Sequence, residues 1–380
     1  MKIAKVETFA VSPRWLFVRI ETEDGHVGWG ESTLEGRART VGVAVDEWAE
    51  YLVGSDPRHI AKHWQVLTKG TFYRGGPVFG SAVAGIDQAL WDILGHHLGV
   101  PVHTLFGGAV RDRLRVYSWV GGDEPHALAD NIHAQREAGF TAVKLNASGS
   151  RARLEGLLAT KAAVETAQTA REAMGDGDFA LDFHGRFSAA DARRVIGEVS
   201  PLHPLFIEEP ILPEYPHKLA EVISSTTVPI ACGERLYSRT DFLPVLQAGI
   251  AVVQPDISHC GGISEGLKIA TLSETFDASF APHCPVGPIG LAASFHVSAV
   301  SPNFIIQEQS VGIHYNVGAE IFDYLVDPAP FDFVDGFAAV PQGAGLGIKV
   351  DEAAVRAAAD RDRDWHSVVW TGSDGGFAEW

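Results

Sequence analysis

The sequence predicts an α/β fold, a (β/α)7β barrel of the TIM type with an α+β capping domain, and three observations carry this prediction. From residue 113 onward, short apolar runs alternate with helical stretches, as in parallel strands joined by helices. The chain before that point has the pattern of a small antiparallel sheet followed by helices, and its final part is rich in Gly, Pro and Trp. We therefore expect a capping domain at 1–112, a barrel at 113–320 and a C-terminal segment at 321–380 that returns to the cap.

The first lobe begins with a strand pattern. Residues 2–31 contain short apolar patches, among them an alternation of Leu16, Val18 and Ile20. The dipeptide Asp24-Gly25 between the last two patches is a strong hairpin signal. We expect an antiparallel meander.

Helical patterns follow the meander at 38–54, 57–68 and 79–98. Asp56 is the expected N-cap of the second helix, with Pro57 at its first position. Gly99, followed shortly by a proline, is expected to end the third helix.

Eight strand candidates then follow in βα order. They are RVYSWV, TAVKLN, FALDFH, PLFIEE, VPIACGE, AVVQPD, ASFAPH and FIIQEQ. Strands that alternate with helices in this way form parallel sheets, and eight of them close into a barrel.

Composition excludes several classes of function. The 380 residues carry a formal charge of −18, which repels nucleic acid and anionic membrane surfaces. No apolar run reaches the ~18 residues of a membrane span, and the amino terminus lacks a signal-peptide core. The three cysteines form no CxxC pair, which fits a reducing compartment. We expect a cytoplasmic protein with neither nucleic acid nor membrane as partner.

Polar residues close nearly all of the apolar runs. From Asp182 onward they recur at intervals of 26, 26, 22, 27 and 25 residues, about one βα unit each. The carboxyl ends of barrel strands meet on one face, where barrel enzymes carry their chemistry. The residues expected at this rim are Lys144, Asn146, Asp182, His184, Glu208, Glu234, Asp256, His283 and Glu308.

Three of these rim residues, Asp182, Glu208 and Glu234, predict a metal site. Carboxylates on consecutive strands repel each other unless a cation lies among them. A ligand set of oxygens alone favours Mg²⁺, with Mn²⁺ as an alternative, over Zn²⁺. Each acid by itself is equally typical of a helix cap, but three at a regular step favour one cation per subunit.

Two histidines are candidates for proton transfer at this site. In a strand, His184 would point to the same side as Asp182, two residues earlier. His283 would lie where Asp256 can hydrogen-bond its ring and raise its basicity. A lone histidine is more often a surface or helix-end residue, so the joint placement on the rim carries this hypothesis. A cation that binds a substrate carboxylate, with one base and one acid, suits β-elimination of water through an enediolate.

These residues resemble the enolase superfamily, in its mandelate racemase-like group, over nearly the whole chain. The segment AGIDQALWD at 84–92 is similar to the helix that joins cap and barrel, and DFH at 182–184 with IEEP at 207–210 is similar to the second family signature. The resemblance implies a cap built from both chain ends, a (β/α)7β barrel and one Mg²⁺ on the three acids.

Within the family, the galactonate dehydratase subgroup is the most similar. The segments that carry this likeness are VGWGE, EGRARTV, FYRGGP, VYSWVGGD, KLN, LDFHGR, FIEEP, QPDISH, APHCP, QEQS, GIHYN and AEW. The likeness implies that His283, paired with Asp256, removes the C2 proton, and that His184 protonates the departing 3-hydroxyl. Glu308 and Lys144 would contact the substrate carboxylate or the enediolate. A symmetric homo-oligomer, often an octamer, is also implied.

The substrate and one alternative reaction stay open at this point. Racemases of the group carry Lys-x-Lys on the second strand, whereas here Asn146 stands in the place of the second lysine, so a dehydratase is favoured over a racemase or epimerase. Asn146 and the cap-loop residues Arg37, Tyr73 and Arg74 are expected to bind the hydroxyls of an acid sugar. Another hexonate or a pentonate stays an alternative substrate. A non-catalytic binding protein would have lost a ligand or a proton-transfer residue, and none is missing.

Overall fold

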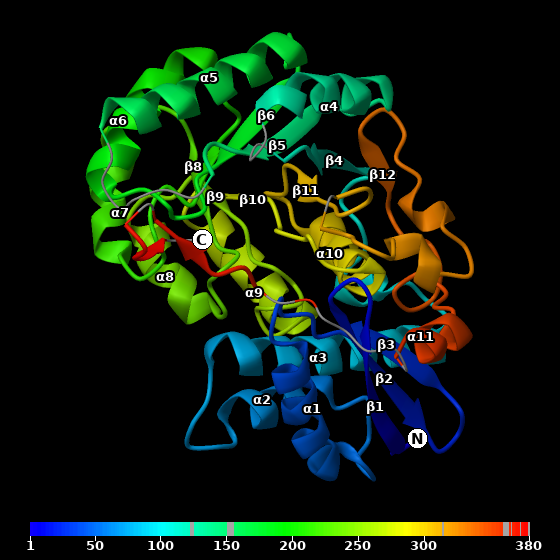
Figure 1. The fold of residues 1–380 in the computed structure, drawn as a ribbon. Helices are drawn as coiled ribbons and strands as arrows, with labels where there is room; N and C mark the ends of the chain where they lie inside the picture. The colour runs from blue at the N-terminus through cyan, green and yellow to red at the C-terminus, as the bar shows by residue number, and fades with distance from the viewer. Residues whose placement is uncertain are drawn as a thin grey trace.

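The chain forms a β/α barrel with a smaller lobe packed against it, as a computed structural model shows (Figure 1). The structure describes residues 1–121, 125–149, 156–313, 315–359, 365, 367–372 and 374–378. Three of the quoted segments, VYSWVGGD, GIHYN and AEW, extend partly outside these residues.

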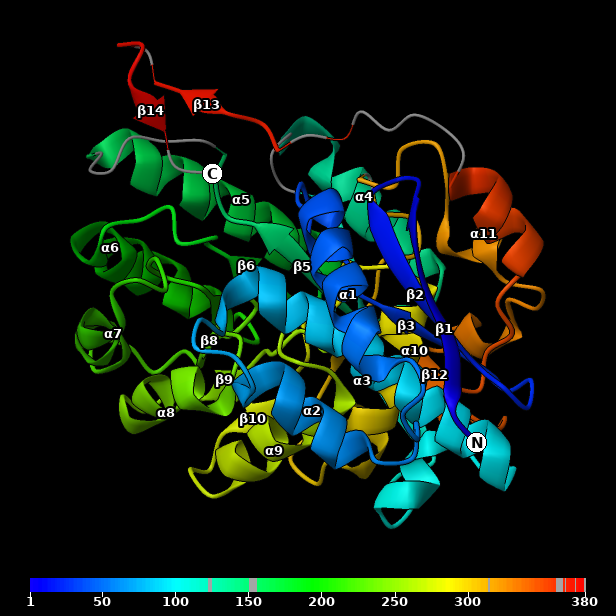
Figure 2. The same ribbon diagram turned by 90° about the horizontal axis from the view of Figure 1, so that it is seen from below.

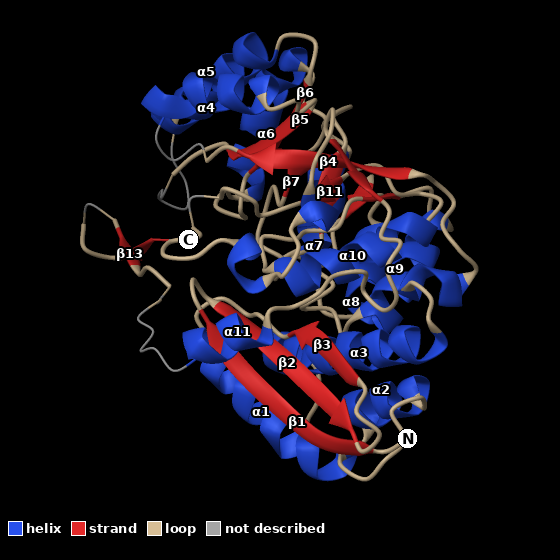
Figure 3. Cartoon of the chain, turned by 90° about the vertical axis from the view of Figure 1, so that its right-hand side faces the viewer, coloured by secondary structure: helices blue, strands red, loops and turns tan. Residues whose placement is uncertain are grey.

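The lobe combines a three-stranded sheet with three helices (Figure 3). The strands β1 (Ile3–Val11), β2 (Trp15–Thr22) and β3 (Val27–Glu31) pair in antiparallel order. Gly25 has a φ of 87° in the turn between β2 and β3, as the Asp-Gly signal predicts. The helices that follow are α1 (Ala38–Leu52), α2 (Ile60–Lys69) and α3 (Gly76–Leu98), with the 3₁₀ turn η1 (Val102–Phe106).

The predicted start of the second helix is wrong. Helix α2 begins at Ile60, with His59 rather than Asp56 as its N-cap residue. An Asp56 carboxylate oxygen accepts the backbone N–H of Arg58 at 3.0 Å and also pairs with the Arg58 guanidinium. Aspartate often bonds to the backbone two residues later, and this local turn replaces the first helical turn here.

Strand β3 lies directly on the backbone of α3, and two glycines make this contact feasible. A Cβ on Gly28 would lie 2.2 Å from the carbonyl oxygen of Ala89, and one on Gly30 would lie 1.8 Å from that of Gly85. The glycines of VGWGE therefore allow a close approach that no other residue type permits.

The barrel strands are parallel and follow the chain order from β4 to β10, and β11 then pairs with β4. Between β10 and β11 the closure rests on a bridge between Phe280 and Phe304. The bounds are β4 (Arg113–Trp119), α4 (Pro125–Glu137), β5 (Ala142–Asn146), α5 (Leu157–Met174), β6 (Asp178–Asp182), α6 (Ala189–Val199), η2 (Ser200–Leu202), β7 (Ile207–Glu208), α7 (Pro216–Ile223), β8 (Ile230–Cys232), α8 (Arg239–Gln247), β9 (Val252–Val253), α9 (Ile263–Glu274), β10 (Ser279–Phe280), α10 (Pro288–Val300) and β11 (Gln307–Glu308). Among the described residues a helix follows each of the first seven strands, so the predicted (β/α)7β barrel is confirmed.

Side chains fill the interior of the barrel. One cluster of buried residues takes a member from each strand or its immediate flank, and it comprises Tyr117, Ala142, Ala180, Phe206, Ala231, Val252, Ala281 and Ile306. The interior is therefore a packed core rather than a pore, and it supports the rim at the carboxyl ends of the strands.

The C-terminal part contacts both lobe and barrel. Beyond the 3₁₀ turns η3 (Ile321–Tyr324) and η4 (Ala329–Phe331), strand β12 (Phe337–Ala339) pairs antiparallel with β4 of the barrel. Helix α11 (Glu352–Ala359) packs against β1 of the lobe, as Figure 2 shows. The short strands β13 (Trp370–Thr371) and β14 (Phe377–Ala378) form a separate hairpin. The domain limits at residues 112 and 320 stay a prediction.

Among the described helices, none combines the length and the apolar character needed to cross a bilayer.

Candidate active site

The acidic residues of the rim come together because neighbouring strands share one register. Asp182, the last residue of β6, pairs with Asn146 of β5 on one side and with Glu208 of β7 on the other. Glu234 follows β8 by two residues, and Glu308 ends β11. The strand pattern alone therefore places these side chains around one axis.

Asp182, Glu208 and Glu234 form a compact group of carboxylates. Each offers an oxygen, and the three oxygens lie within 4.8 Å of one another. Burial raises the pKa of Asp182 well above its usual range, and the charge of Glu208 raises it further. Burial and the charge of Glu209 do the same for the pKa of Glu234. The raised pKa values show that three ionised carboxylates at this spacing repel each other unless a positive charge lies among them. The all-oxygen donor set fits a divalent cation.

Lys144 of β5 supplies positive charge from within the barrel. Its Nζ lies 2.9 Å from a Glu208 oxygen and 3.0 Å from a Glu308 oxygen. Burial by itself would lower the pKa of Lys144, but the charges of Glu208 and Glu308 outweigh it and hold that pKa well above the usual value. The lysine therefore stays charged beside Glu208, Glu308 and, at 4.0 Å, Asp182.

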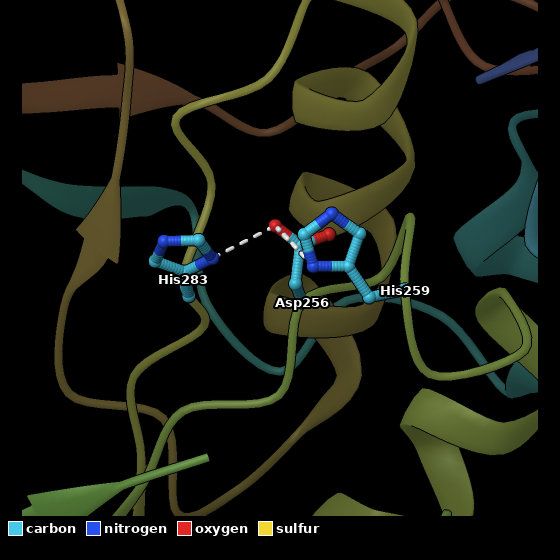
Figure 4. A group of neighbouring side chains, drawn as sticks. All are labelled: Asp256, His259 and His283. Carbon is cyan, nitrogen blue, oxygen red and sulfur yellow. Dashed lines mark hydrogen bonds and ion pairs between the residues drawn. The ribbon is translucent and has the colours of Figure 1, made fainter. Parts of the chain in front are cut away.

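His283 forms a hydrogen-bonded pair with Asp256, as Figure 4 shows. The ring Nδ1 lies 2.9 Å from Asp256 Oδ2, while Nε2 lies 3.1 Å from a Glu234 oxygen. The other Asp256 oxygen accepts the backbone N–H of Ser258 at 2.6 Å. Burial would lower the pKa of His283, but the charges of Glu234 and Glu308 together with the Asp256 bond raise it to about 10. A cation held by Glu234 would oppose this rise, because it offsets the largest of those charges.

His184 lies in the predicted site, but a turn after β6 places its side chain there rather than the strand alternation that the sequence predicted. Strand β6 ends at Asp182, and His184 has a φ of 49°, so strand alternation does not set its direction. The turn nevertheless brings the ring Nδ1 to 3.1 Å from Asp182 Oδ2. Burial lowers the pKa of His184 well below its usual value, followed by the charges of Arg186 and Arg235.

One cavity of about 250 Å³ joins these groups. Its lining comprises Arg14, Leu34, Glu35, Trp119, Lys144, Asp182, His184, Glu234, Arg235, Tyr237, His259, His283, Pro285, Glu308, Ile313, Tyr315 and Trp365. Lys144, two of the three metal-ligand candidates (Asp182 and Glu234) and both histidines thus face one space between barrel and cap. A second group, Asp256 with His259 and His283, also has three ligand atoms within 4.8 Å. In that group Asp256 and His283 already share a proton in their hydrogen bond.

Four predicted substrate contacts do not line this cavity. Arg37 is exposed and donates to the carbonyl oxygen of Gly36, and Tyr73 is 81% exposed. Arg74 lines a different cavity of about 590 Å³ between α2, α3 and the loops before α8 and α9. Asn146 is fully buried at the end of β5. Their role in substrate binding stays a prediction.

Several residues that line the cavity were not predicted from the sequence. Glu35 lies in the predicted cap loop, two residues from Arg37, but it is the one that turns inward. Arg14 follows a proline in the turn between β1 and β2, where strand patterning gives no signal. His259 follows Asp256 by three residues within QPDISH, and this spacing was a usable signal.

Comparison with known proteins agrees with this geometry. The family model for the enolase C-terminal domain-like region matches residues 127–354, and the model for the mandelate racemase / muconate lactonizing enzyme N-terminal domain matches residues 5–107. The chain therefore belongs to the enolase superfamily, in the mandelate racemase / muconate lactonizing enzyme family. Two curated relatives are the D-galactonate dehydratases of Ralstonia nicotianae, 50% identical, and Xanthomonas euvesicatoria pv. vesicatoria, 49% identical, each aligned over 100% of both chains.

Solved structures give the same result for the fold. An enolase from Agrobacterium radiobacter with bound sodium and L-malate has a TM-score of 0.90 at 32% identity, with 100% of both chains covered. A mandelate racemase/muconate lactonizing enzyme from Jannaschia sp. CCS1 has a TM-score of 0.86 at 30% identity, covering 96% of this chain and 100% of that one. The barrel with its capping lobe is therefore a shared architecture.

Proposed function

We propose that this protein is a hydro-lyase that dehydrates D-galactonate to 2-dehydro-3-deoxy-D-galactonate and water. The observation that carries the proposal is the cavity lined by His184, His283, Asp182 and Glu234, the last two of which form a close group of carboxylates with Glu208. Full-length identity of 50% to a D-galactonate dehydratase supports the choice of substrate.

His283 is the base in this scheme. Its Nδ1 proton is held by Asp256, which leaves Nε2, on the cavity side, to take the proton from C2 of the substrate. Lys144 and Glu308 lie 3.0 Å apart in the lining of the cavity and would contact the substrate carboxylate as it gains charge. Asp182, Glu208 and Glu234 would hold a divalent cation, which we propose to be Mg²⁺ and which stabilises the negative charge on that carboxylate.

His184 is the acid. Removal of the C2 proton leaves its electron pair in an enediolate; this pair then forms the C2=C3 double bond as the C3–O bond breaks, and the His184 ring proton goes to the departing hydroxyl to make water. The resulting enol becomes the 2-keto product. Burial and the charges of Arg186 and Arg235 lower the pKa of His184, so the ring acts as the acid only in the fraction of the protein in which it carries the extra proton.

The wider setting is also a proposal. All three cysteines, Cys232, Cys260 and Cys284, lie in the described part of the chain as free thiols, which supports a reducing, cytoplasmic compartment. We propose a homo-oligomer, with an octamer as the state that the family resemblance favours.

A substrate screen tests the proposal. Purified protein with Mg²⁺ is incubated with galactonate, other hexonates and pentonates, and 2-keto acid is trapped with semicarbazide. We expect product from galactonate. Absence of product from every acid sugar would overturn the proposal, and inversion at C2 without loss of water would show a racemase.

Two histidine variants separate the acid from the base. His283→Asn should stop both water loss and exchange of the C2 proton with deuterium oxide, whereas His184→Asn should stop water loss and leave some exchange. His217→Asn, at an exposed position on α7, is the matched control. Exchange that survives only in His283→Asn would reverse the two roles.

A further inference from the structure

A third imidazole, His259, lies beside the Asp256–His283 pair. It belongs to the turn between β9 and α9, lines the active-site cavity and is 5% exposed. Its Nδ1 is 3.9 Å from Asp256 Oδ2, the same oxygen that bonds His283. Figure 4 shows the two rings on either side of this carboxylate. Asp256 therefore faces two imidazoles.

The other edge of the His259 ring faces the cap. Its Nε2 lies 3.7 Å from Oε2 of Glu35, in the loop after β3. Within the described part of the chain this buried nitrogen has no hydrogen-bond partner. The imidazole thus stands between one carboxylate of the barrel and one of the cap loop.

Both gaps are slightly too long for a hydrogen bond and too short for a bridging water. Hydrogen bonds of this kind span about 2.7–3.2 Å, and a bridging water needs roughly 4.5 Å between the groups it joins. A movement of less than about 1 Å on each side would close both contacts. The His259 ring is therefore already placed between Asp256 and Glu35, but it is not yet hydrogen-bonded to either of them.

We propose that His259 is a positioning residue that couples Glu35 of the cap loop to the Asp256–His283 pair, and that bound substrate tightens this link. The inference rests on the proposed function, since it assigns the pair to C2 proton removal. With His259 bonded, Asp256 would accept from Ser258, His283 and His259, which fixes the plane of its carboxylate. The carboxylate in turn fixes the direction of His283 Nε2.

The charge on Asp256 agrees with this arrangement. Burial would raise the pKa of Asp256, yet that pKa is lowered, first by the charge of His259 and then by the His283 hydrogen bond. His259 therefore helps to keep Asp256 ionised as the partner of the base.

Paired variants test the coupling. His259→Asn keeps a donor near the Nδ1 position toward Asp256, and His259→Gln keeps one near Nε2 toward Glu35. Each is combined with Glu35→Ala, and Glu221→Ala, an exposed carboxylate of α7, is the control. Glu35 is partly exposed, so its substitution leaves the packing intact. We measure kcat, KM and C2 deuterium exchange for galactonate with saturating Mg²⁺.

Coupling predicts a specific pattern. Glu35→Ala and His259→Asn should each lower kcat by about 10- to 100-fold, in the range found for residues that orient a reacting group, with exchange falling in parallel. The kcat of the variant that combines His259→Asn with Glu35→Ala should equal that of His259→Asn alone, because both substitutions break the same link. His259→Gln should remain sensitive to Glu35→Ala.

Other outcomes overturn the inference. A rise in KM with unchanged kcat would make His259 a plain substrate contact. If the fold-losses in kcat of His259→Asn and Glu35→Ala multiply in the variant that carries both, the two residues are not coupled. A normal kcat in the single variants would show the same. Turnover by the unsubstituted chain tests the proposed function separately: if it is absent, both proposals fail, and if it is present, the variants alone decide the link.

Discussion

Two regions of this molecule bury carboxylates, and they differ in what the carboxylates touch. One is the docking face between cap and barrel, formed by α3 with Glu31 of β3, and the other is the rim group Asp182, Glu208 and Glu234. All are buried except Glu234, whose side chain is 12% exposed. Each region contains one of the two segments that resemble the family signatures.

At the docking face, backbone N–H groups satisfy the acids. Asp92 accepts from Trp29 N at 2.9 Å and from Leu346 N at 2.8 Å. Glu31 accepts from Gly287 N at 2.7 Å and from Gly290 N at 2.8 Å, at the start of α10. These bonds join strand β3, helix α3 and the barrel, so this face serves assembly.

Asp87 follows the same rule on α3. Its two oxygens accept the backbone N–H of Ser264 at 2.9 Å and the hydroxyl of the same residue at 2.5 Å, at the start of α9. Helix N-termini favour negative charge, which makes them suitable partners for acids that join two lobes.

The rim acids mostly face each other. Among the described residues, the one backbone donor to the three is the N–H of His184, at 2.7 Å from Asp182. Glu208 depends on Lys144 and on Gln254, whose amide lies 2.7 Å away. In these two groups, the acids with few donors are the ones proposed to bind the cation, and the acids satisfied by backbone N–H groups join the two lobes.

The largest test of this comparison is Glu234→Gln. We expect kcat/KM for galactonate to fall by at least about 1000-fold, because a metal ligand that stabilises developing charge is lost. The melting temperature of the metal-free protein should stay equal or rise, since one repelling charge is gone. A large fall in that melting temperature would mean that Glu234 serves architecture.

Metal removal gives the next effect. Mg²⁺ at about 100 times its Kd should stabilise the folded protein by about 2.7 kcal/mol relative to protein with EDTA. Thermal unfolding with and without EDTA measures this shift. Glu234→Gln should lose most of it and Asp92→Asn should keep it. Equal shifts in both variants would contradict a cation at the rim.

Asp92→Asn tests the docking face. Asparagine offers one oxygen and sets an NH₂ group against a backbone N–H, so we expect a loss of about 2 kcal/mol in unfolding free energy. Activity of the folded protein should stay close to that of the unsubstituted chain. Denaturant unfolding and initial rates give both numbers, with Asp176→Asn, at an exposed position, as control. Lost activity with unchanged stability would refute the division of roles.

Much of the rim was predictable from sequence, because the position of a residue at a strand end depends on chain period alone. The spacing of Asp182, Glu208 and Glu234 needed no knowledge of packing. The fold class followed for the same reason. The partnership of Asp256 with His283 also followed from spacing, and the structure contains that hydrogen bond.

Other features depend on tertiary contacts that no local pattern encodes. Whether Glu35 or Arg37 turns into the cavity is set by packing of the cap loop on the barrel. The pairing of β12 with β4 joins segments far apart in sequence. Local side-chain bonds also override patterns, as Asp56 shows by capping a turn instead of a helix.

The smallest expected effect is a pH dependence at the docking face. Burial raises the pKa of Glu31 to about 7 from an ordinary value of 4.5. An acid with a raised folded-state pKa stabilises the fold fully below pH 4.5 and loses that contribution as pH rises through 7. Between pH 6 and 7, the loss from Glu31 is about 1 kcal/mol. Glu31→Gln should therefore show a shallower decline in unfolding free energy over this interval, measured with saturating Mg²⁺, whereas Glu221→Gln should keep the original slope. Identical slopes in all three proteins would mean that the backbone N–H groups at the start of α10 already hold Glu31 in its ionised form. Glu31 would then act as a negative charge that stabilises the N-terminus of that helix.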